Sequence, residues 1–204
     1  IARIGVSANL LKNQFRAGNP MGGRLLSLTT PQLNAPWQLY ELEGKEHLSE
    51  PFVFNCKVTS PRPDWQPQQL LNQPVEITIT DEQRRTIKGI VYQCEPVVDA
   101  NHASPNQFSY RLQVVPTLKL LEHHHDARVF QDLTIPEIVM SVFSELGVFN
   151  YITNFHHDYQ ALPYVVQYQE SSLHFVQRLL EAAGIFYYFD FLNDSNLVMG
   201  DNPT

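Results

Sequence analysis

Two histidine clusters are the first candidates for chemistry in this sequence of 204 residues. His123–His125 is followed by an aspartate, and so is the pair His156-His157. Zinc accepts both groups as ligands, but a zinc site needs three or four of them around one point. Neighbouring residues of a strand point to opposite faces, so the triplet presents at most two rings to one side. The sequence contains no H-E-x-x-H and no C-x-x-C spacing. We therefore predict no metal site, and a polar loop at residues 123–125.

Nucleophiles and phosphate-binding loops are equally poorly represented. There is no G-x-S-x-G elbow, and Ser171-Ser172 is better placed to cap a helix. Cys56 and Cys94 lie in alternating apolar runs, so we predict buried, reduced and inert thiols. The patterns G-x-G-x-x-G and G-x-x-x-x-G-K-[ST] are absent. A carboxylate pair for glycoside hydrolysis stays open, because such pairs converge in space and not in sequence. The acidic candidates are more simply the solvated face of strands and turns: Glu41, Glu43, Glu46 and Glu50.

Phe186–Phe191 is a dense aromatic run that could offer a stacking platform to a base or a sugar. A strand that is packed on both faces also needs aromatic residues throughout, and we favour this interpretation. The search therefore predicts no catalytic residues, no cofactor and no metal. On these grounds the chain is a structural or binding module and not an enzyme.

The charge balance excludes some partners. Asp and Glu number 21 against 14 Lys and Arg, and this net charge of −7 argues against nucleic-acid binding. No apolar run reaches the roughly 20 residues of a membrane-spanning helix, and residues 1–23 lack the apolar core of a signal peptide. The charge is also uneven: residues 1–24 contain four bases and no acid, whereas residues 129–204 contain nine acids and only Arg178. Such asymmetry can serve contact between subunits, or only solubility.

Residues 25–116 alternate apolar and polar positions with period two, as in Phe52–Val58, Val75–Ile79 and Phe108–Val114. We predict strands joined by turns, with a hairpin turn at residues 81–83 and a loop from Pro61 to Pro74. A bulge or tight bend would suit the glycine at position 89. Several strands without a long helix favour a small antiparallel barrel or sandwich.

The period changes in the second half of the chain. Apolar residues follow i, i+3, i+4, i+7 from Ile135 to Leu146, with Thr134 as a plausible N-cap and a glycine at 147. A second helix is predicted at about Ser172 to Ala183, followed by strands at Ile185–Phe191 and Leu197–Met199. The predicted fold is α+β and mainly β, with an N-terminal extension (1–24), an antiparallel β-barrel (25–118) and an α+β domain with two helices (119–204). An initial Ile and an end in a turn just after a strand suggest a truncated sequence.

Four segments resemble one family. Residues 164–188 (YVVQYQESSLHFVQRLLEAAGIFYY) are similar to the signature of VgrG proteins, except that Ser172 stands where the family usually has Asp. Residues 44–52 (GKEHLSEPF), 88–91 (KGIV) and 128–139 (RVFQDLTIPEIV) agree with it in order and spacing. The chain is thus identified as a member of the VgrG family over about residues 25–203.

This resemblance implies the N-terminal, phage tail hub-like region of a type VI secretion spike. Family members are trimers that dock on the hexameric tube protein Hcp and contact baseplate proteins. A following needle, tipped by a PAAR protein, carries effectors through membranes by mechanical puncture. Assembly would take place in the bacterial cytoplasm, with export that needs no Sec signal. The alternatives are a contractile phage tail hub and a cell-wall-degrading hub enzyme. We also hypothesise that basic residues 1–24 of one subunit meet an acidic neighbour.

Overall fold

The computed structural model describes residues 13–14, 25–31, 37–61, 65–80, 84–97 and 107–202. Most of the predicted extension 1–24 and the predicted turn at 81–83 lie outside these residues. The chain divides into two compact units, which we call the barrel unit (1–47, 52–116 and 191–195) and the helix unit (48–51, 117–190 and 196–204). The bounds of the three predicted domains stay predictions. No helix in the described ranges is both long and apolar enough to cross a membrane.

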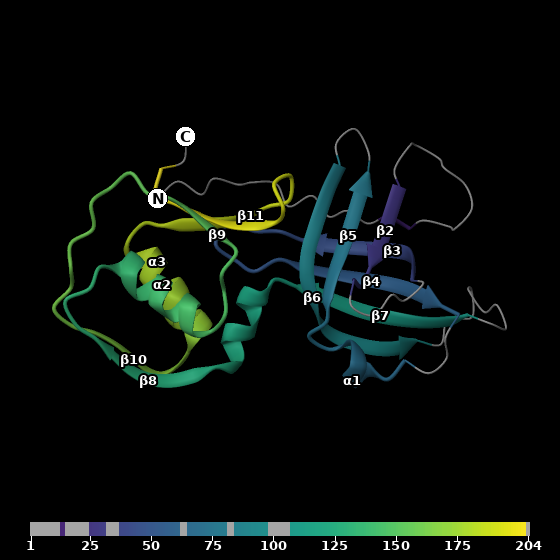
Figure 1. Ribbon diagram of the computed structural model, residues 1–204, viewed down its shortest axis with the longest axis horizontal. Coiled ribbons are helices and arrows are strands. Elements are labelled where there is room, and N and C mark those ends of the chain that lie inside the picture. The colour runs from purple at the N-terminus through teal and green to yellow at the C-terminus, as the bar shows by residue number, and fades with distance from the viewer. Residues whose placement is uncertain are drawn as a thin grey trace. The chain divides into compact units, whose positions relative to one another are not determined.

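The barrel unit contains one seven-stranded sheet in the order β1-β3-β4-β7-β6-β5-β2, and every neighbouring pair is antiparallel. The sheet curls until β2 and β3 contact each other, which makes it a nearly closed barrel (Figure 1). This confirms the predicted antiparallel barrel. Its elements are β1 (Asn13–Gln14), β2 (Leu25–Thr29), β3 (Gln38–Lys45), β4 (Val53–Ser60), α1 (Pro67–Leu70), β5 (Pro74–Thr80), β6 (Arg84–Val97) and β7 (Phe108–Val115).

The period-two pattern decides which side chains fill the barrel. In β5, Val75, Ile77 and Ile79 are buried and the residues between them are partly exposed, as the alternation predicts. β4 follows the same rule with Phe54 and Cys56 inside. β5 and most of β4 therefore bury one face, and the sheet closes around that face.

Gly89 has a different role from the one predicted. It pairs with Val75 in regular register, and the bulge in β6 lies between Val91 and Gln93. A Cβ atom at position 89 would lie 2.6 Å from the carbonyl oxygen of Val115 and 2.9 Å from the Cγ1 atom of Val114. The glycine is needed because β6 and β7 approach closely, not because the strand bends, so the predicted bulge at this residue was wrong.

The helix unit is layered. Two helices lie between a two-stranded sheet of β8 and β10 and a three-stranded sheet in the order β11-β12-β9 (Figure 1). β8 and β10 are antiparallel, and β9 runs parallel to β12. Its elements are η1 (Thr117–His123), β8 (His125–Phe130), α2 (Ile135–Glu145), β9 (Tyr151–Asn154), β10 (Val165–Ser171), α3 (Ser172–Ala182), β11 (Phe186–Asp190) and β12 (Asn196–Gly200).

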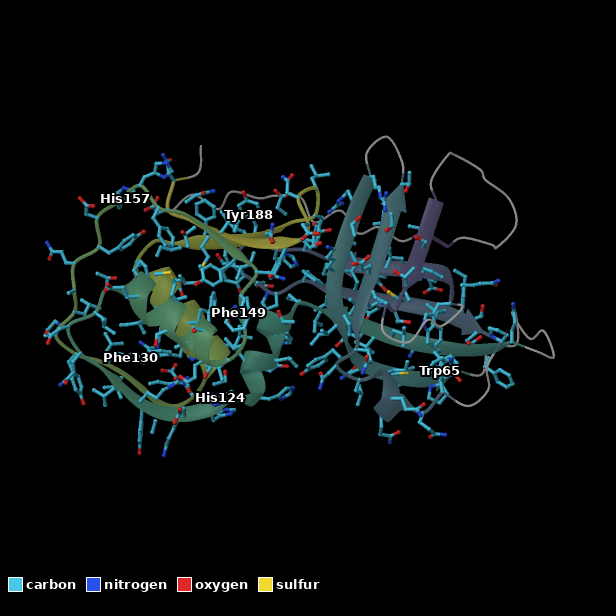
Figure 2. All side chains as sticks on the ribbon, in the orientation of Figure 1. Trp65, His124, Phe130, Phe149, His157 and Tyr188 are labelled. Carbon is cyan, nitrogen blue, oxygen red and sulfur yellow. The ribbon has the colours of Figure 1, made fainter. Side chains whose placement is uncertain are left out.

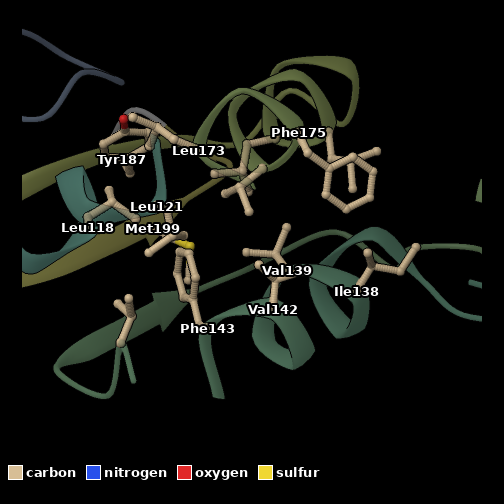
Figure 3. Packing of buried hydrophobic residues seen from close by; sticks show 14 of the residues in the cluster. Leu118, Leu121, Ile138, Val139, Val142, Phe143, Leu173, Phe175, Tyr187 and Met199 are labelled. Atoms are coloured by element: carbon tan, nitrogen blue, oxygen red, sulfur yellow. The ribbon is translucent and has the colours of Figure 1, made fainter. Parts of the chain in front are cut away.

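Both predicted helices are confirmed to within about two residues, because each has strong boundary signals. Thr134 caps α2 in a full capping box with Glu137, and Ser171 caps α3 by accepting from the backbone N–H of His174. Gly147 and Gly184 follow the two helices with φ of 77° and 71°, a region that favours glycine. The core of the unit forms where the apolar stripes of α2 and α3 meet side chains of the three-stranded sheet (Figure 3).

Candidate interaction surface and its supporting network

The two histidine clusters are separate in the helix unit. Figure 2 shows His124 beside β8 and His157 in the loop after β9, on opposite sides of the two helices. In the described part of the chain, no three His, Cys, Asp or Glu side chains are placed to hold a metal ion. The predicted polar loop at 123–125 was wrong: His123 ends η1 and His125 begins β8, because β8 must start there to pair with Ser171.

His156 and His157 instead surround the carboxylate of Asp201, which follows β12. This carboxylate is 2% exposed and accepts hydrogen bonds of 2.9 Å from the backbone N–H groups of both histidines and from the hydroxyl of Tyr159. Burial would raise the pKa of Asp201, but the hydrogen bonds outweigh it and hold the pKa well below its ordinary value. Burial, together with the bond to Asp201, raises the pKa of Tyr159 to about 12. The buried carboxylate therefore fixes the loop after β9, while the rings of His156 and His157 stay more than half exposed.

We expect Asp201→Asn to loosen this loop, because an amide cannot accept from all three donors. Exchange of the amide hydrogens of His156 and His157 should accelerate by about tenfold, measured by hydrogen–deuterium exchange. Since the folded-state pKa is depressed, the stabilisation is present above an ordinary aspartate pKa and is lost only as pH falls through the lowered value. Protection in the wild type should therefore persist at about pH 5. Asp158→Asn, at an exposed position of the same loop, is the control; equal exchange in both variants would contradict the role of Asp201.

The thiols are buried, as predicted. Cys56 and Cys94 both lie opposite Leu112, one on each neighbouring strand, so two strand spacings of roughly 4.8 Å separate them. A disulfide needs Cα atoms within about 7 Å, so these cysteines stay free. Burial raises the pKa of Cys56, and burial raises the pKa of Cys94 to about 11. Neither thiol is a candidate nucleophile.

The aromatic run 186–191 forms β11 and the turn after it. Tyr187 points into the core of the helix unit and is 1% exposed, while Tyr188 on the other face is 40% exposed. The prediction that both faces are packed is thus right for one face only. The single exposed ring does not form a platform of stacked aromatic side chains.

A buried polar network joins β8, β10 and the start of α3. Arg128 donates to the Oε1 atom of Gln167 (3.1 Å) and to the hydroxyl of Ser172 (3.0 Å). The guanidinium also pairs with Glu145 at the end of α2. The side chains of Gln167 and Ser172 are fully buried, and His124 contacts the same hydroxyl at 3.0 Å. Position 172 is the one where the family usually has Asp. Ser172 is not the helix cap, as the sequence suggested, but accepts a hydrogen bond from Arg128.

The network also supports an irregular stretch of β10. The register with β8 shifts between Gln167 and Glu170, and Gln169 has a φ of 53°, which is rare for a residue with a long side chain. The side-chain amide of Gln167 donates to the carbonyl oxygen of Glu170 (3.1 Å), so this buried side chain stabilises the bulge. The Glu170 carboxylate is in turn bound by Arg178, which lowers its pKa. The signature residues of this segment therefore serve local structure.

The opposite side of this two-stranded sheet exposes apolar side chains. Tyr168 is 66% exposed, Tyr164 59% and Val129 52%. We call this surface the β8–β10 face; it consists of Ala127 and Val129 on β8, Val166 and Tyr168 on β10, and Tyr164 directly before β10. Sequence reasoning missed it. The signal was present, because apolar residues occupy both alternating sets of positions in 164–168, so that one set must face away from the helices.

Comparison with known proteins gives these features a context. Residues 45–204 match the family described as phage tail baseplate hub (GPD). The type VI secretion system spike protein VgrG1b of Pseudomonas aeruginosa is 34% identical over 169 residues, which are 81% of this chain and 22% of that protein. The chain therefore spans about a fifth of this relative's length.

Solved structures agree on the fold. The E. coli c3393 protein is described as a component of the type VI secretion system with structural similarity to T4 bacteriophage tail proteins gp27 and gp5. It has a TM-score of 0.79 at 26% identity, covering 87% of this chain and 49% of its own. A 43 kDa prophage tail protein of Shewanella oneidensis has a TM-score of 0.61 at 15% identity over 87% of this chain and 53% of its own, which shows the fold alone. These matches are structural spike and hub proteins. The chain belongs to the phage tail baseplate hub (GPD) family and is a member of the VgrG family.

Proposed function

We propose that this chain is the hub region of a type VI secretion spike, which forms a homotrimer and docks on the hexameric tube protein Hcp. The observation that supports this most is continuous similarity to a VgrG spike protein through both units of the chain. A nearly closed β-barrel is a rigid body whose outer surface can match a neighbouring ring. Three copies of such a body close around an axis by heterologous contacts.

The finer parts of the proposal concern partners and place of action. The spike would assemble in the cytoplasm with baseplate proteins and leave the cell without a Sec signal. It would carry a PAAR tip and effectors through regions outside this chain, and would cross membranes by puncture alone. Nucleic acid and cofactors have no part in this function. A contractile phage tail hub is the alternative that shares the fold, but similarity of 30–34% identity to several type VI secretion spike proteins favours the spike.

The test is direct assembly on the tube. The purified chain is mixed with hexameric tube protein, and the complexes are imaged by electron microscopy and measured by light scattering. We expect threefold caps at tube ends whose hub mass is three times 23.5 kDa. A chain that leaves the tube ends bare at every ratio would overturn the hub proposal.

The enzyme alternative has a separate test. Incubation of the chain with purified peptidoglycan should release no muropeptides, because the proteins that the chain matches are structural spike and hub proteins. Release that survives in Asp201→Asn but disappears in another carboxylate variant would identify a catalytic group and contradict a purely structural role.

A further inference from the structure

The buried hydroxyl group of Ser172 lies at the centre of the network that joins β8, β10 and the start of α3. Its oxygen is 3.0 Å from the Nη2 atom of Arg128, 3.2 Å from the Nε2 atom of Gln167 and 3.0 Å from the Nδ1 atom of His124. A serine hydroxyl accepts at most two hydrogen bonds and donates one. The roles of the first two neighbours therefore determine the role of the third.

Arg128 and Gln167 both donate to this oxygen. A guanidinium has donors only, so Arg128 has no other role. The side-chain amide of Gln167 is oriented by its two other contacts. Its Oε1 atom accepts from the Nε atom of Arg128, and its Nε2 atom donates to the carbonyl oxygen of Glu170, both at 3.1 Å. The second hydrogen of Nε2 then points to Ser172, and the two donors occupy both lone pairs of the hydroxyl oxygen.

His124 must accept the remaining hydrogen, which is the hydroxyl proton of Ser172. Its Nδ1 atom then carries no proton, and the neutral ring is protonated on Nε2. The backbone fixes the same approach, because the N–H group of Ser172 donates to the carbonyl oxygen of His124 at 2.8 Å. Ser172 is fully buried, and no other acceptor for its hydroxyl proton lies among the described residues.

We propose that the contact between His124 and Ser172 is a pH-sensitive switch that holds the start of α3 against the junction of η1 and β8. A second proton on the ring would make Nδ1 a donor, so the hydroxyl would face three donors with two lone pairs. Its own proton would lose its acceptor in a buried site, which costs free energy. The contact therefore forms at about pH 8, where a histidine ring is neutral, and breaks at about pH 5, where the imidazolium dominates.

The consequence reaches the β8–β10 face. Gln167 bonds to the same hydroxyl and also stabilises the bulge beside Tyr168. Loss of the contact with His124 therefore weakens the support of this bulge. The inference goes beyond the proposed function and does not rest on it.

The charged groups around His124 favour the same outcome. Arg128 contacts the same oxygen atom, so an imidazolium would meet a like charge there. The guanidinium is itself paired with Asp126 of β8 and Glu145 of α2. Carboxylates ordinarily titrate near pH 4, so these two pairs remain at pH 5.

The other elements at the junction contribute charges that are already paired. On η1, Lys119 pairs with Glu122, and on β10 the Glu170 carboxylate pairs with Arg178 and with His174 of α3. The remaining histidines of the junction, His123 and His125, have exposed side chains. They also titrate between pH 5 and 8, so the test needs variants that separate them from His124.

Nitrogen NMR of the full chain with 15N-labelled histidine tests the assigned protonation state. At about pH 8 we expect an unprotonated Nδ1 atom and a protonated Nε2 atom in the ring of His124. The signals of this ring are those that disappear in His124→Asn. A ring with its proton on Nδ1 at this pH would overturn the proposal.

Hydrogen–deuterium exchange tests the switch. Between about pH 8 and 5, after correction for the intrinsic rate, the backbone amide of Ser172 should lose protection roughly fivefold, as expected for the loss of one hydrogen bond. In His124→Asn the Oδ1 atom can accept in place of Nδ1 and cannot be protonated, so protection should be equal at both pH values. His125→Asn is the control and should keep the wild-type dependence. Constant protection in the wild type, or an equal loss in His124→Asn, would contradict the proposal.

Ser172→Asp provides a second variant, and circular dichroism checks that each variant is folded. A carboxylate can accept from Arg128, Gln167 and an imidazolium together, so protection of the amide at position 172 should persist at about pH 5. A fivefold loss in this variant as well would mean that another group is the switch, and would overturn the proposal. The measurements do not involve the tube protein, so their failure would leave the hub proposal unchanged.

Discussion

Arg128→Ala is expected to lower the free energy of unfolding by about 3 kcal/mol, because it leaves the buried Oε1 atom of Gln167 without its donor and Glu145 without its partner. The Arg128 side chain is only 14% exposed, and its guanidinium supplies the hydrogen bonds to the fully buried Gln167 and Ser172. The same group ties β8 to Glu145 at the end of α2. Its loss therefore weakens the junction of two helices and the two-stranded sheet at once. Urea unfolding, followed by far-UV circular dichroism, measures this change in the free energy of unfolding.

Arg178→Ala is the matched control. Arg178 also pairs with a glutamate, but its side chain is 45% exposed, so this ion pair is worth at most about 1 kcal/mol. Arg128→Lys should recover little, since an ammonium cannot reproduce a planar fork that serves several acceptors. Equal losses for the two alanine variants would show that the buried network contributes no more than a surface ion pair.

The helices were the most predictable part of the fold, because their signals are local. Thr134 and Glu137 lie three residues apart and form the capping box that this spacing predicts. In the barrel, alternation predicted strands at 52–58, 75–79 and 108–114, which the structure contains as β4, β5 and β7. Such patterns involve residues that are close together in the chain, so they can be recognised in a single sequence.

Features that depend on pairing between distant segments could not be predicted. Nothing local places Arg128 opposite Gln167, so the buried network and the role of Ser172 as its acceptor became visible only in the structure. The β8–β10 face left a signal only in its second strand, whose apolar residues occur in both alternating sets; its pairing with β8 left none, because the two strands are more than thirty residues apart. Many of these residues lie in the segments that resemble the family, but the resemblance does not say what each residue does. In this chain those tasks are structural, which agrees with a hub that acts through shape and contact.

The role of Gly89 also depends on a neighbouring strand that is distant in sequence, so the local pattern did not predict it. Gly89→Ala should lower the free energy of unfolding by about 2 kcal/mol and Gly89→Val by about 3 kcal/mol, as overpacking does. The reason is a collision with backbone: the new Cβ atom would lie 2.6 Å from the carbonyl oxygen of Val115. Relief requires β6 and β7 to separate at their pairing, where Ile90 faces Val115.

Gly200→Ala provides the control, because Gly200 is also a strand glycine. The nearest atom to a Cβ there is Cζ of Phe186 at 3.3 Å, and this partly exposed ring can move aside. We expect a loss below about 1 kcal/mol, measured by the same urea unfolding. Comparable losses at both positions would mean that glycine is needed for strand geometry in general. A loss confined to position 89 would mean that the barrel closes tightly enough to exclude a single methyl group between two strands.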